Sequence, residues 1–189
     1  MIIGLTSFTG AGKTTVTDYL VSKDFEYYSL SDILRQKLKS RQKEVTRENL
    51  QAVGNELRRE HGNSVLADKT LERIEQDTGK DAGGGKDFAV DSIRNPAEIE
   101  ALRKNKDFTL VFIDAPIKLR FERTKARKRE KDPTTFKDFK KSEEKELQSK
   151  DSSNQQLLRC REMADFVIHN DSTLETLYKK IDELLEGLR

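Results

Sequence analysis

The chain has few of the residues that build disulfides or zinc sites, with one cysteine and two histidines in 189 residues. The single Cys160 excludes a disulfide within the chain and any cysteine-based zinc site, and His61 and His169 are too far apart in sequence to indicate a metal cluster. A zinc deaminase centre is excluded too, because it needs a His-x-Glu and a Pro-Cys-x-x-Cys segment. We therefore expect a reducing, cytoplasmic setting.

Long apolar runs are also missing. No uninterrupted apolar stretch approaches the roughly 18 residues that a membrane-spanning helix needs. The chain runs directly into Ile2 and Ile3 without a basic leader. We expect neither export nor membrane insertion.

Charge of one sign is not in excess, because 36 Lys and Arg residues stand against 34 Asp and Glu residues. This balance predicts no nucleic-acid partner from overall charge. Charged residues make up 37% and hydrophobic residues 34%, which indicates a lean core and a heavily ionised surface. The length fits one globular domain.

Short apolar runs alternate with segments of helical period. The run Phe108–Ile113 is apolar on both faces, which is typical of a parallel strand covered by helices on each side. Leucine and isoleucine recur at intervals of three and four between Leu174 and Leu188, as in an amphipathic helix. The predicted strands are Ile2–Leu5, Phe25–Leu30, Phe88–Val90, Phe108–Ile113 and Phe166–Ile168. Their order predicts an α/β layer fold with ligands at the carboxyl ends of the strands.

Two helices are predicted between the second and third strands. One follows Thr46 and carries Val53 and Leu57 on one face, and the other runs from about Asn63 past Ile74. The Gly-rich stretch 81–85 is expected to be a connecting loop. We expect a single domain over residues 1–189, with a core of 1–30, 87–122 and 164–189, a helical insertion at about 31–80 and a lid at about 123–150.

The strongest motif directly follows the first strand and opens the first helix. Glycines let successive backbone amides converge on phosphates, and the helix N-terminus adds positive potential. Lys13 reaches the β- and γ-phosphates, and the Thr14 hydroxyl can hold Mg²⁺. The motif consists of Gly10, Ala11, Gly12, Lys13, Thr14 and Thr15. It predicts a phosphate-binding loop (P-loop) for ATP with Mg²⁺.

One position departs from the usual P-loop pattern, which has a glycine five residues before Gly12. This chain has Ser7 there. Serine fits if that backbone position has a negative φ. A glycine turn with an incidental lysine is the alternative, but the strand before and the helix after favour the P-loop.

Ser31-Asp32-Ile33-Leu34-Arg35 follows the second strand and resembles the start of the acceptor-facing helix in adenylate kinases. The resemblance implies that Arg35 binds the acceptor phosphate and that Asp32 faces the acceptor. An ordinary helix N-cap by Ser31 or Asp32 explains the local sequence equally well.

The third strand ends in Asp91-Ser92-Ile93-Arg94, which is similar to the Asp-Gly-x-x-Arg segment of nucleoside monophosphate kinases. Ser92 replaces the glycine, and Arg94 comes one position early. The resemblance implies that Asp91 orders the Mg²⁺ shell opposite Thr14. It makes Arg94 a second clamp on the acceptor phosphate, and a polar surface turn is the alternative.

After the fourth strand, residues 122–127 resemble the lid entrance of adenylate kinases. Arg123 and Arg127 are four residues apart, so on a helix both can point into the cleft and neutralise charge on the transferring group. Arg129 could join them, whereas Arg120 and Lys128 are expected to face solvent. A solvated helix face is the alternative for this basic run.

Over most of its length the chain resembles a cytoplasmic P-loop family related to adenylate kinase and dephospho-coenzyme A kinase. That family is known from archaea and, in bacteria, also fused to deoxycytidylate deaminase domains. The resemblance rests on segments 28–35, 54–58, 91–94, 120–123 with 132–133 beyond, and 164–170. It implies a three-layer P-loop NTPase fold with a five-stranded parallel sheet, a helical acceptor-binding insertion and a short lid. It also implies that Arg58 contacts the acceptor, and a surface salt bridge is the alternative.

Three functions are consistent with these motifs. The favoured one is transfer of the γ-phosphoryl group of ATP to a (deoxy)nucleoside monophosphate, in which Lys13, Arg94, Arg123 and Arg127 are catalytic. Dephospho-coenzyme A kinase is the first alternative, and its hydroxyl acceptor would need a carboxylate base such as Asp32. The second alternative is a nucleotide-sensing regulatory module. The expected partners are small-molecule nucleotides, while base preference and oligomeric state stay open.

Overall fold

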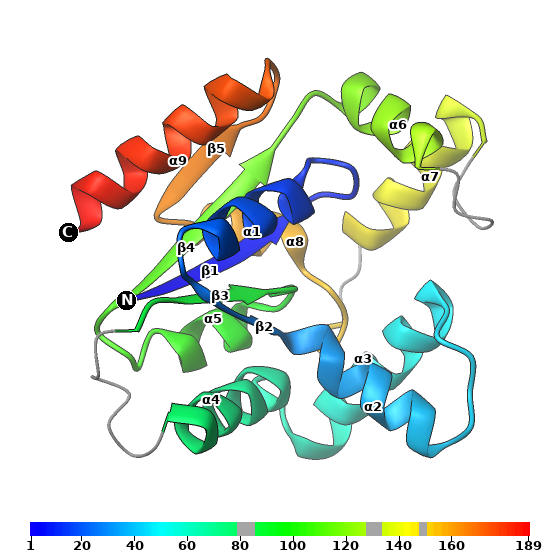
Figure 1. The fold of residues 1–189 in the computed structure, drawn as a ribbon. Coiled ribbons are helices and arrows are strands. Elements are labelled where there is room, and N and C mark those ends of the chain that lie inside the picture. The colour runs from blue at the N-terminus through cyan, green and yellow to red at the C-terminus, as the bar shows by residue number, and fades with distance from the viewer. Residues whose placement is uncertain (79–85, 128–133, 148–150) are drawn as a thin grey trace.

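Five parallel strands form one sheet at the centre of the molecule. The computed structural model describes residues 1–78, 86–127, 134–147 and 151–189, so the Gly-rich stretch 81–85 lies outside the described residues. The sheet order is β2-β3-β1-β4-β5 (Figure 1). The strands are β1 (Ile2–Ser7), β2 (Glu26–Ser29), β3 (Phe88–Asp91), β4 (Phe108–Asp114) and β5 (Phe166–His169). The all-parallel α/β prediction and its strands are confirmed.

Helices connect successive strands. In chain order they are α1 (Lys13–Ser22), α2 (Leu30–Ser40), α3 (Arg47–His61), α4 (Val65–Thr78), α5 (Pro96–Leu102), α6 (Ile117–Ala126), α7 (Phe136–Leu147), α8 (Leu157–Glu162) and α9 (Leu174–Leu188). Thr46 begins α3, because its side-chain oxygen accepts a bond from the Asn49 backbone N–H at 3.1 Å. The two predicted helices between β2 and β3 are therefore α3 and α4, and α2 precedes them.

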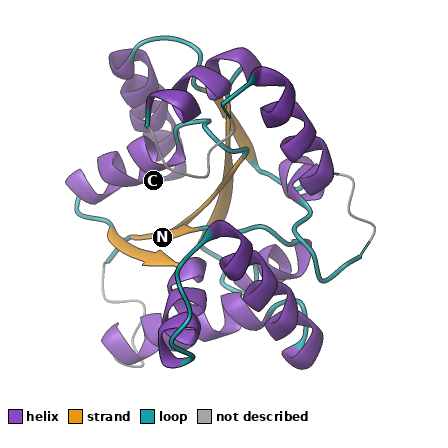
Figure 2. Ribbon diagram, turned by 90° about the vertical axis from the view of Figure 1, so that its right-hand side faces the viewer, coloured by secondary structure: helices purple, strands orange, loops and turns teal. Residues whose placement is uncertain are grey.

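Alternate side chains of β1, β3 and β4 enter two separate cores. On β1, Ile2 belongs to the core that contains residues of α2, α3, α4, α5 and α8, whereas Ile3 belongs to the core that contains residues of α1 and α9. This period of two is the geometry of a strand buried on both faces. In β4, Leu110 and Phe112 are 0% exposed, as the unbroken apolar run predicts. Figure 2 shows the resulting layers, with helices on both sides of the sheet.

The α6–α7 pair lies beside the carboxyl end of β4, across the sheet edge from the α2–α3 pair (Figure 1). Three rings hold the pair together. Phe121 of α6 has its ring centre 5.6 Å from that of Phe136 and 5.7 Å from that of Phe139, both on α7. The described part of the predicted lid therefore packs directly on the core.

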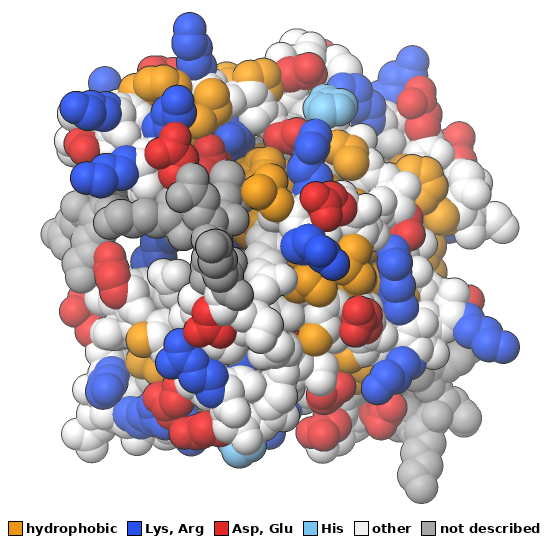
Figure 3. All heavy atoms as spheres, turned by 180° about the vertical axis from the view of Figure 1, so that it is seen from behind, with side chains coloured by type: hydrophobic (Ala, Val, Ile, Leu, Met, Phe, Trp, Pro, Cys, Tyr) orange, Lys and Arg blue, Asp and Glu red, His pale blue; other side chains and the backbone are white. Residues whose placement is uncertain are grey.

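Two surface properties bear on the predicted partners. None of the helices in the described ranges is long and apolar enough to cross a bilayer. On the face shown in Figure 3, Lys and Arg side chains are interspersed with Asp and Glu side chains. A mixed-sign surface of this kind gives that face no strong field of one charge.

Candidate functional site

The loop between β1 and α1 has the backbone of a phosphate-binding loop. Gly10 has φ 80° and Gly12 has φ 97°, values that L side chains rarely adopt. Gly12 is the N-cap residue of α1, so the first turn of the helix and its orphan N–H groups follow at once. The motif expected from the sequence therefore lies between the central strand and a helix N-terminus.

Ser7 stands where the usual pattern has glycine, and its backbone accommodates serine. It is the last residue of β1. The described non-glycine residues with positive φ are Asp24, Gln42 and Ser92. Ser7 thus has the negative φ that the sequence analysis required.

Neighbouring elements approach both glycines too closely for a side chain. A Cβ on Gly10 would lie 2.4 Å from the Arg120 backbone oxygen and 2.7 Å from Thr124 Oγ1. A Cβ on Gly12 would lie 2.2 Å from Asn170 Nδ2. The loop is therefore packed between α6 and the residue that follows β5.

We expect Gly12→Ala to destabilise the domain by about 2 kcal/mol or more and to weaken ATP binding, because it adds left-handed strain and a clash. Asn170 cannot easily move aside, since its Nδ2 donates to the Ala11 backbone oxygen at 2.9 Å. Urea unfolding and titration with a fluorescent ATP analogue measure the two effects. The matched control is Gly187→Ala in α9, where a Cβ meets nothing within 4 Å and helix propensity predicts a gain of about 0.5–1 kcal/mol. Equal unfolding curves for the two variants would contradict the packing argument.

Lys13, the first residue of α1, forms an ion pair with Asp91 at the end of β3. The side chains of Lys13 and Asp91 are 16% and 9% exposed. Asp91 also accepts bonds from the Ser92 backbone N–H and from the Tyr27 hydroxyl, the latter at 3.3 Å. The predicted P-loop lysine and the predicted metal-ordering aspartate therefore meet directly, although they are 78 residues apart.

Two arginines add positive charge around Lys13. Burial is the largest cause of a lowered pKa for Lys13, the Asp91 carboxylate opposes it, and the charges of Arg94 and Arg35 lower it further. The contacts agree with this: Arg35 Nη1 donates to Ser31 Oγ, which lies 3.3 Å from the hydroxyl of Ser92, the residue after Asp91. The structure thus brings Lys13, Arg35 and Arg94 together from α1, α2 and the turn after β3.

Three serine hydroxyls line the carboxyl ends of β2 and β3 beside these charges. Ser29 Oγ lies 2.8 Å from Ser31 Oγ and 3.2 Å from Ser92 Oγ, and Ser92 Oγ lies 3.3 Å from Ser31 Oγ. Ser92 is held at φ 67°, where the resembled family has glycine. Non-glycine residues in this region of φ cluster at functional sites. Sequence reasoning noted Ser92 only as a substitution and did not foresee this group, which we call the serine cluster.

Arg35 is exposed on the first turns of α2. Its Nη1 donates to Ser31 Oγ at 2.8 Å and to Asp32 Oδ1 at 2.6 Å. The Arg35 and Asp32 side chains are 49% and 47% exposed, so a ligand can reach both. The alternative, in which Ser31 or Asp32 is the N-cap, is not found, because Ser29 is the N-cap residue of α2 and makes no side-chain cap bond.

Arg94 lies in the turn between β3 and α5. Its Nη1 donates to Gln155 Oε1 at 3.0 Å. Its backbone oxygen accepts from the Gln156 N–H at 2.8 Å, and the neighbouring Ile93 oxygen accepts from Thr6 Oγ1 at 2.8 Å. This turn is firmly bonded on several sides rather than being a loose surface loop.

Arg123 reaches the P-loop through Asn170. Its Nη1 donates to the Asn170 backbone oxygen at 3.0 Å and to the Ala11 oxygen at 3.5 Å, and partial burial lowers its pKa. Arg127 is exposed at the end of α6. Asn170 was missed by the sequence reasoning, although a polar residue at the carboxyl end of a strand was a usable signal.

The prediction that Arg120 faces solvent is wrong. Arg120 is 5% exposed, and its guanidinium binds the Glu143 carboxylate of α7 and the Thr9 backbone oxygen of the P-loop. Its position one turn before Thr124 puts it on the inner face of α6 rather than the outer face. Lys128 and Arg129 lie outside the described residues.

Arg58 forms a buried ion pair with Glu98 of α5, at 2.8 Å between Nη2 and Oε1. The alternative foreseen for this residue was a salt bridge at the surface, but Arg58 is 3% exposed. Its contact with the acceptor stays a prediction.

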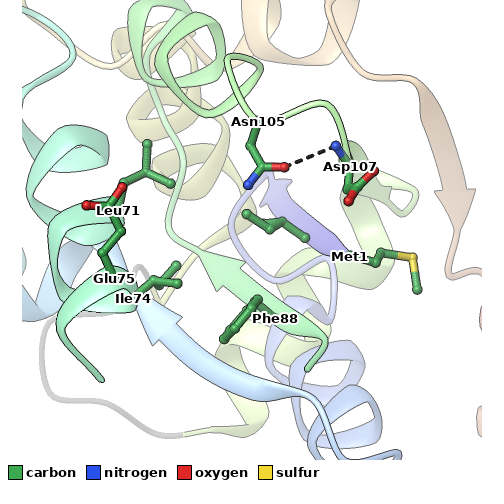
Figure 4. Close-up of a pocket in the computed structure, with 8 residues that line it drawn as sticks. Met1, Leu71, Ile74, Glu75, Phe88, Asn105 and Asp107 are labelled. Carbon is green, nitrogen blue, oxygen red and sulfur yellow. Dashed lines mark hydrogen bonds between the residues drawn. The ribbon is translucent and has the colours of Figure 1, made fainter. Parts of the chain in front are cut away.

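The hollow drawn in Figure 4 is remote from all these residues. It is lined by residues such as Met1, Leu71, Phe88 and Asp107. Met1 and Phe88 lie at the amino ends of β1 and β3, whereas the P-loop follows the carboxyl end of β1. In parallel α/β sheets ligands bind at the carboxyl ends, so this hollow is not the candidate site.

The fold and the loop together define a P-loop protein of kinase-like architecture. Residues 3–156 match the AAA domain family AAA_18. The UPF0200 protein of Sulfurisphaera tokodaii is 31% identical over 187 residues, which cover 99% of this chain and 97% of that protein. The UPF0200/UPF0201 protein of Archaeoglobus fulgidus is 30% identical over 97% of this chain, and the chain spans only 54% of that longer relative. The chain belongs to the UPF0200 family, with an AAA domain over residues 3–156.

Solved structures share the fold at low identity. The crystal structure of TT1252 from Thermus thermophilus aligns with a TM-score of 0.61, 18% identity and coverage of 100% of this chain and 98% of that one. Shikimate kinase from Aquifex aeolicus aligns with a TM-score of 0.50, 20% identity and coverage of 99% and 97%. At such identities the likeness shows the fold and leaves the acceptor undetermined.

Proposed function

We propose that this protein transfers the γ-phosphoryl group of ATP to a small phosphorylated acceptor, a (deoxy)nucleoside monophosphate. The observation that carries the proposal is the convergence of Lys13, Arg35 and Arg94 at the carboxyl ends of β1, β2 and β3. Lys13 is paired with Asp91, Arg35 is bonded to Ser31 of the serine cluster, and Arg94 follows Ser92 of that cluster by two residues. Three cations in one place are suited to two phosphate-bearing ligands. The assignment of residues 31–80 as the acceptor-binding insertion and 123–150 as the lid belongs to this proposal.

The acceptor phosphate is proposed to bind between Arg35, Arg94 and the serine cluster. Hydroxyls and guanidinium groups are donors that suit phosphate oxygens. Ser31 Oγ accepts a hydrogen bond from Arg35 at 2.8 Å. An arriving phosphate can accept this bond in place of Ser31, and the Ser31 hydroxyl can rotate to donate to the phosphate. The proximity of Arg35 and Arg94 to Lys13 supports a position for this phosphate next to the γ-phosphate on the P-loop.

The chemistry requires positioning rather than a strong base. One acceptor phosphate oxygen forms a bond to the γ-phosphorus while the bond from that phosphorus to the bridging oxygen breaks, and ADP leaves with the electron pair. An acceptor phosphate is already anionic, so no proton need be removed first. Lys13, with Arg94, Arg123 and Arg127 in the proposed catalytic set, neutralises the charge on the transferring group.

The donor set also suits Mg²⁺. Thr14 is exposed in the first turn of α1 and Asp91 ends β3, and both offer hard oxygen ligands. Magnesium is usually held by one or two carboxylates together with substrate phosphates, so these two residues would hold it. The ion would supply charge neutralisation on the ATP phosphates.

A hydroxyl acceptor such as dephospho-coenzyme A is the less favoured alternative. It needs a free carboxylate base. Asp32 is bonded to Arg35 at 2.6 Å, and Asp91 is the proposed Mg²⁺ ligand, so neither nearby carboxylate is free to act as that base. This pairing favours an acceptor that is already ionised.

The proposal predicts that ADP release from ATP and Mg²⁺ rises at least about tenfold when the right nucleoside monophosphate is present. A coupled assay with ribo- and deoxynucleoside monophosphates and with dephospho-coenzyme A measures this. Stimulation only by dephospho-coenzyme A would overturn the acceptor class. Nucleotide binding without acceptor-dependent turnover would indicate a regulatory module instead.

A further inference from the structure

One buried carboxylate joins the insertion to the turn that carries Arg94. Glu98 of α5 is 0% exposed and Arg58 of α3 is 3% exposed. Glu98 Oε1 accepts from Arg58 Nε at 3.0 Å and from Arg58 Nη2 at 2.8 Å. A carboxylate that has lost its water requires a counter-charge of this kind to stay ionised.

The second oxygen of the same carboxylate holds the Arg94 turn. Glu98 Oε2 accepts from the Arg94 backbone N–H at 2.8 Å and from the Asn95 backbone N–H at 3.0 Å. The Asn95 bond belongs to an ordinary capping box at the start of α5. The Arg94 bond is an addition to that box, and it fixes the backbone directly at the arginine.

The elements around Arg58 are shaped for this contact. A Cβ on Gly54, one turn earlier on α3, would lie 3.3 Å from Arg58 Nη1. Arg58 Nη1 also reaches the Ser153 backbone oxygen at 3.5 Å, and segment 151–156 is bonded to the Arg94 turn through Asn95 and Gln156. The guanidinium therefore faces Glu98 and segment 151–156.

We propose that Arg58 and Glu98 are positioning residues that act through Arg94. Arg58 holds the Glu98 side chain in place through two hydrogen bonds, and Glu98 fixes the Arg94 backbone so that its guanidinium meets the acceptor phosphate. The inference rests on the proposed function of Arg94, and it gives Arg58 an indirect role in place of direct acceptor contact.

The first experiment needs no acceptor. In Glu98→Gln, amide hydrogen exchange at Arg94 and Asn95 is expected to speed up at least about tenfold, while amides of β1 and β4 keep their rates. Arg58→Lys retains the charge but can donate from only one nitrogen, so it should speed up exchange at Arg94 and Asn95 by a smaller factor. This variant replaces Glu98→Gln in the experiment if Glu98→Gln does not fold. Unchanged exchange at Arg94 in a folded variant would overturn the proposal.

The second experiment separates positioning from general stability. With the monophosphate that gives the highest turnover, Glu98→Gln should raise the acceptor KM about tenfold and leave the ATP KM within about twofold. In an Arg94→Ala background, Glu98→Gln should raise the acceptor KM by less than a further factor of about two, because Glu98 acts on the acceptor only through Arg94. If Glu98→Gln still raised the acceptor KM about tenfold in that background, the proposal that Glu98 acts through Arg94 would be overturned.

The control is Glu56→Gln on the same helix as Arg58. Glu56 forms a two-bond ion pair with Arg41, with 2.8 Å between Arg41 Nη1 and Glu56 Oε2. Within the described part of the chain no bond joins Glu56 to the Arg94 turn. Both KM values should stay within about twofold.

An Arg94→Ala variant with normal acceptor KM would refute the proposed function of Arg94, and the exchange experiment would still decide whether Glu98 holds the turn.

Discussion

Replacing Lys13 with alanine is expected to lower phosphoryl transfer at least about 100-fold while the domain stays folded, because removing one preorganised charge donor costs about that much in comparable sites. Lys13 is the first residue of α1, and its ammonium group lies at Asp91 beside the P-loop. From there it is within reach of the phosphates that the loop binds. The coupled ADP-release assay measures the rate, and thermal unfolding checks the fold.

Lys13→Ala should lower the stability of the domain, because Asp91 loses its cation, but other bonds to Asp91 remain and the domain should stay folded. Asp91 keeps its bonds from the Ser92 backbone N–H and the Tyr27 hydroxyl after the lysine is gone. Lys23→Ala is the matched control, because Lys23 follows the other end of α1 and its pair with Asp182, at 3.0 Å, is exposed. The control should keep its full rate. Unchanged transfer in Lys13→Ala would refute the assignment of the P-loop as the phosphoryl-donor site.

Arg120→Ala is expected to destabilise the domain by about 3–5 kcal/mol, the usual cost of removing one partner of a buried ion pair. The Arg120 guanidinium donates to the Ala115 oxygen at 2.8 Å, to the Thr9 oxygen at 3.3 Å and to both oxygens of Glu143. Without it the Glu143 carboxylate, which is 13% exposed, loses its cation. Urea unfolding measures the loss.

The Arg120 variant should also affect nucleotide binding, since Arg120 joins the P-loop to α7. Its guanidinium lies 5.1 Å from the Phe8 ring centre and 5.9 Å from that of Phe139. Arg103→Ala is the control, because the Arg103–Asp165 pair is 38% and 39% exposed and should contribute no more than about 1 kcal/mol. Similar losses of unfolding free energy in the two variants would show that the buried Arg120 ion pair stabilises the domain no more than the exposed Arg103 pair does.

Local patterns in the sequence were sufficient for the elements of the core. The run at Phe108–Ile113 predicted a strand buried on both faces, and its central residues are 0–1% exposed. The period of the last segment predicted α9, and Thr46 predicted the start of α3. Each signal lies within a few residues, so one sequence can carry it.

The roles of the arginines could not be predicted in the same way. Arg120 was predicted to face solvent, yet it is buried and its partner Glu143 is 23 residues away. The partner of Arg58 is 40 residues away and that of Arg123 is 47 residues away. Charge content alone does not say which helix face becomes buried.

By itself, the sequence determined the strands, the helices and the P-loop, because hydrophobic period and glycine placement act locally along the chain. Only the tertiary structure decided which charges meet. The pairing of Lys13 with Asp91, the contacts of Ser92 with Ser29 and Ser31, and the pairing of Arg58 with Glu98 join groups that are 40 to 78 residues apart. A long flexible side chain takes the partner that folding brings within hydrogen-bond distance, and that choice follows from packing rather than from neighbouring residues.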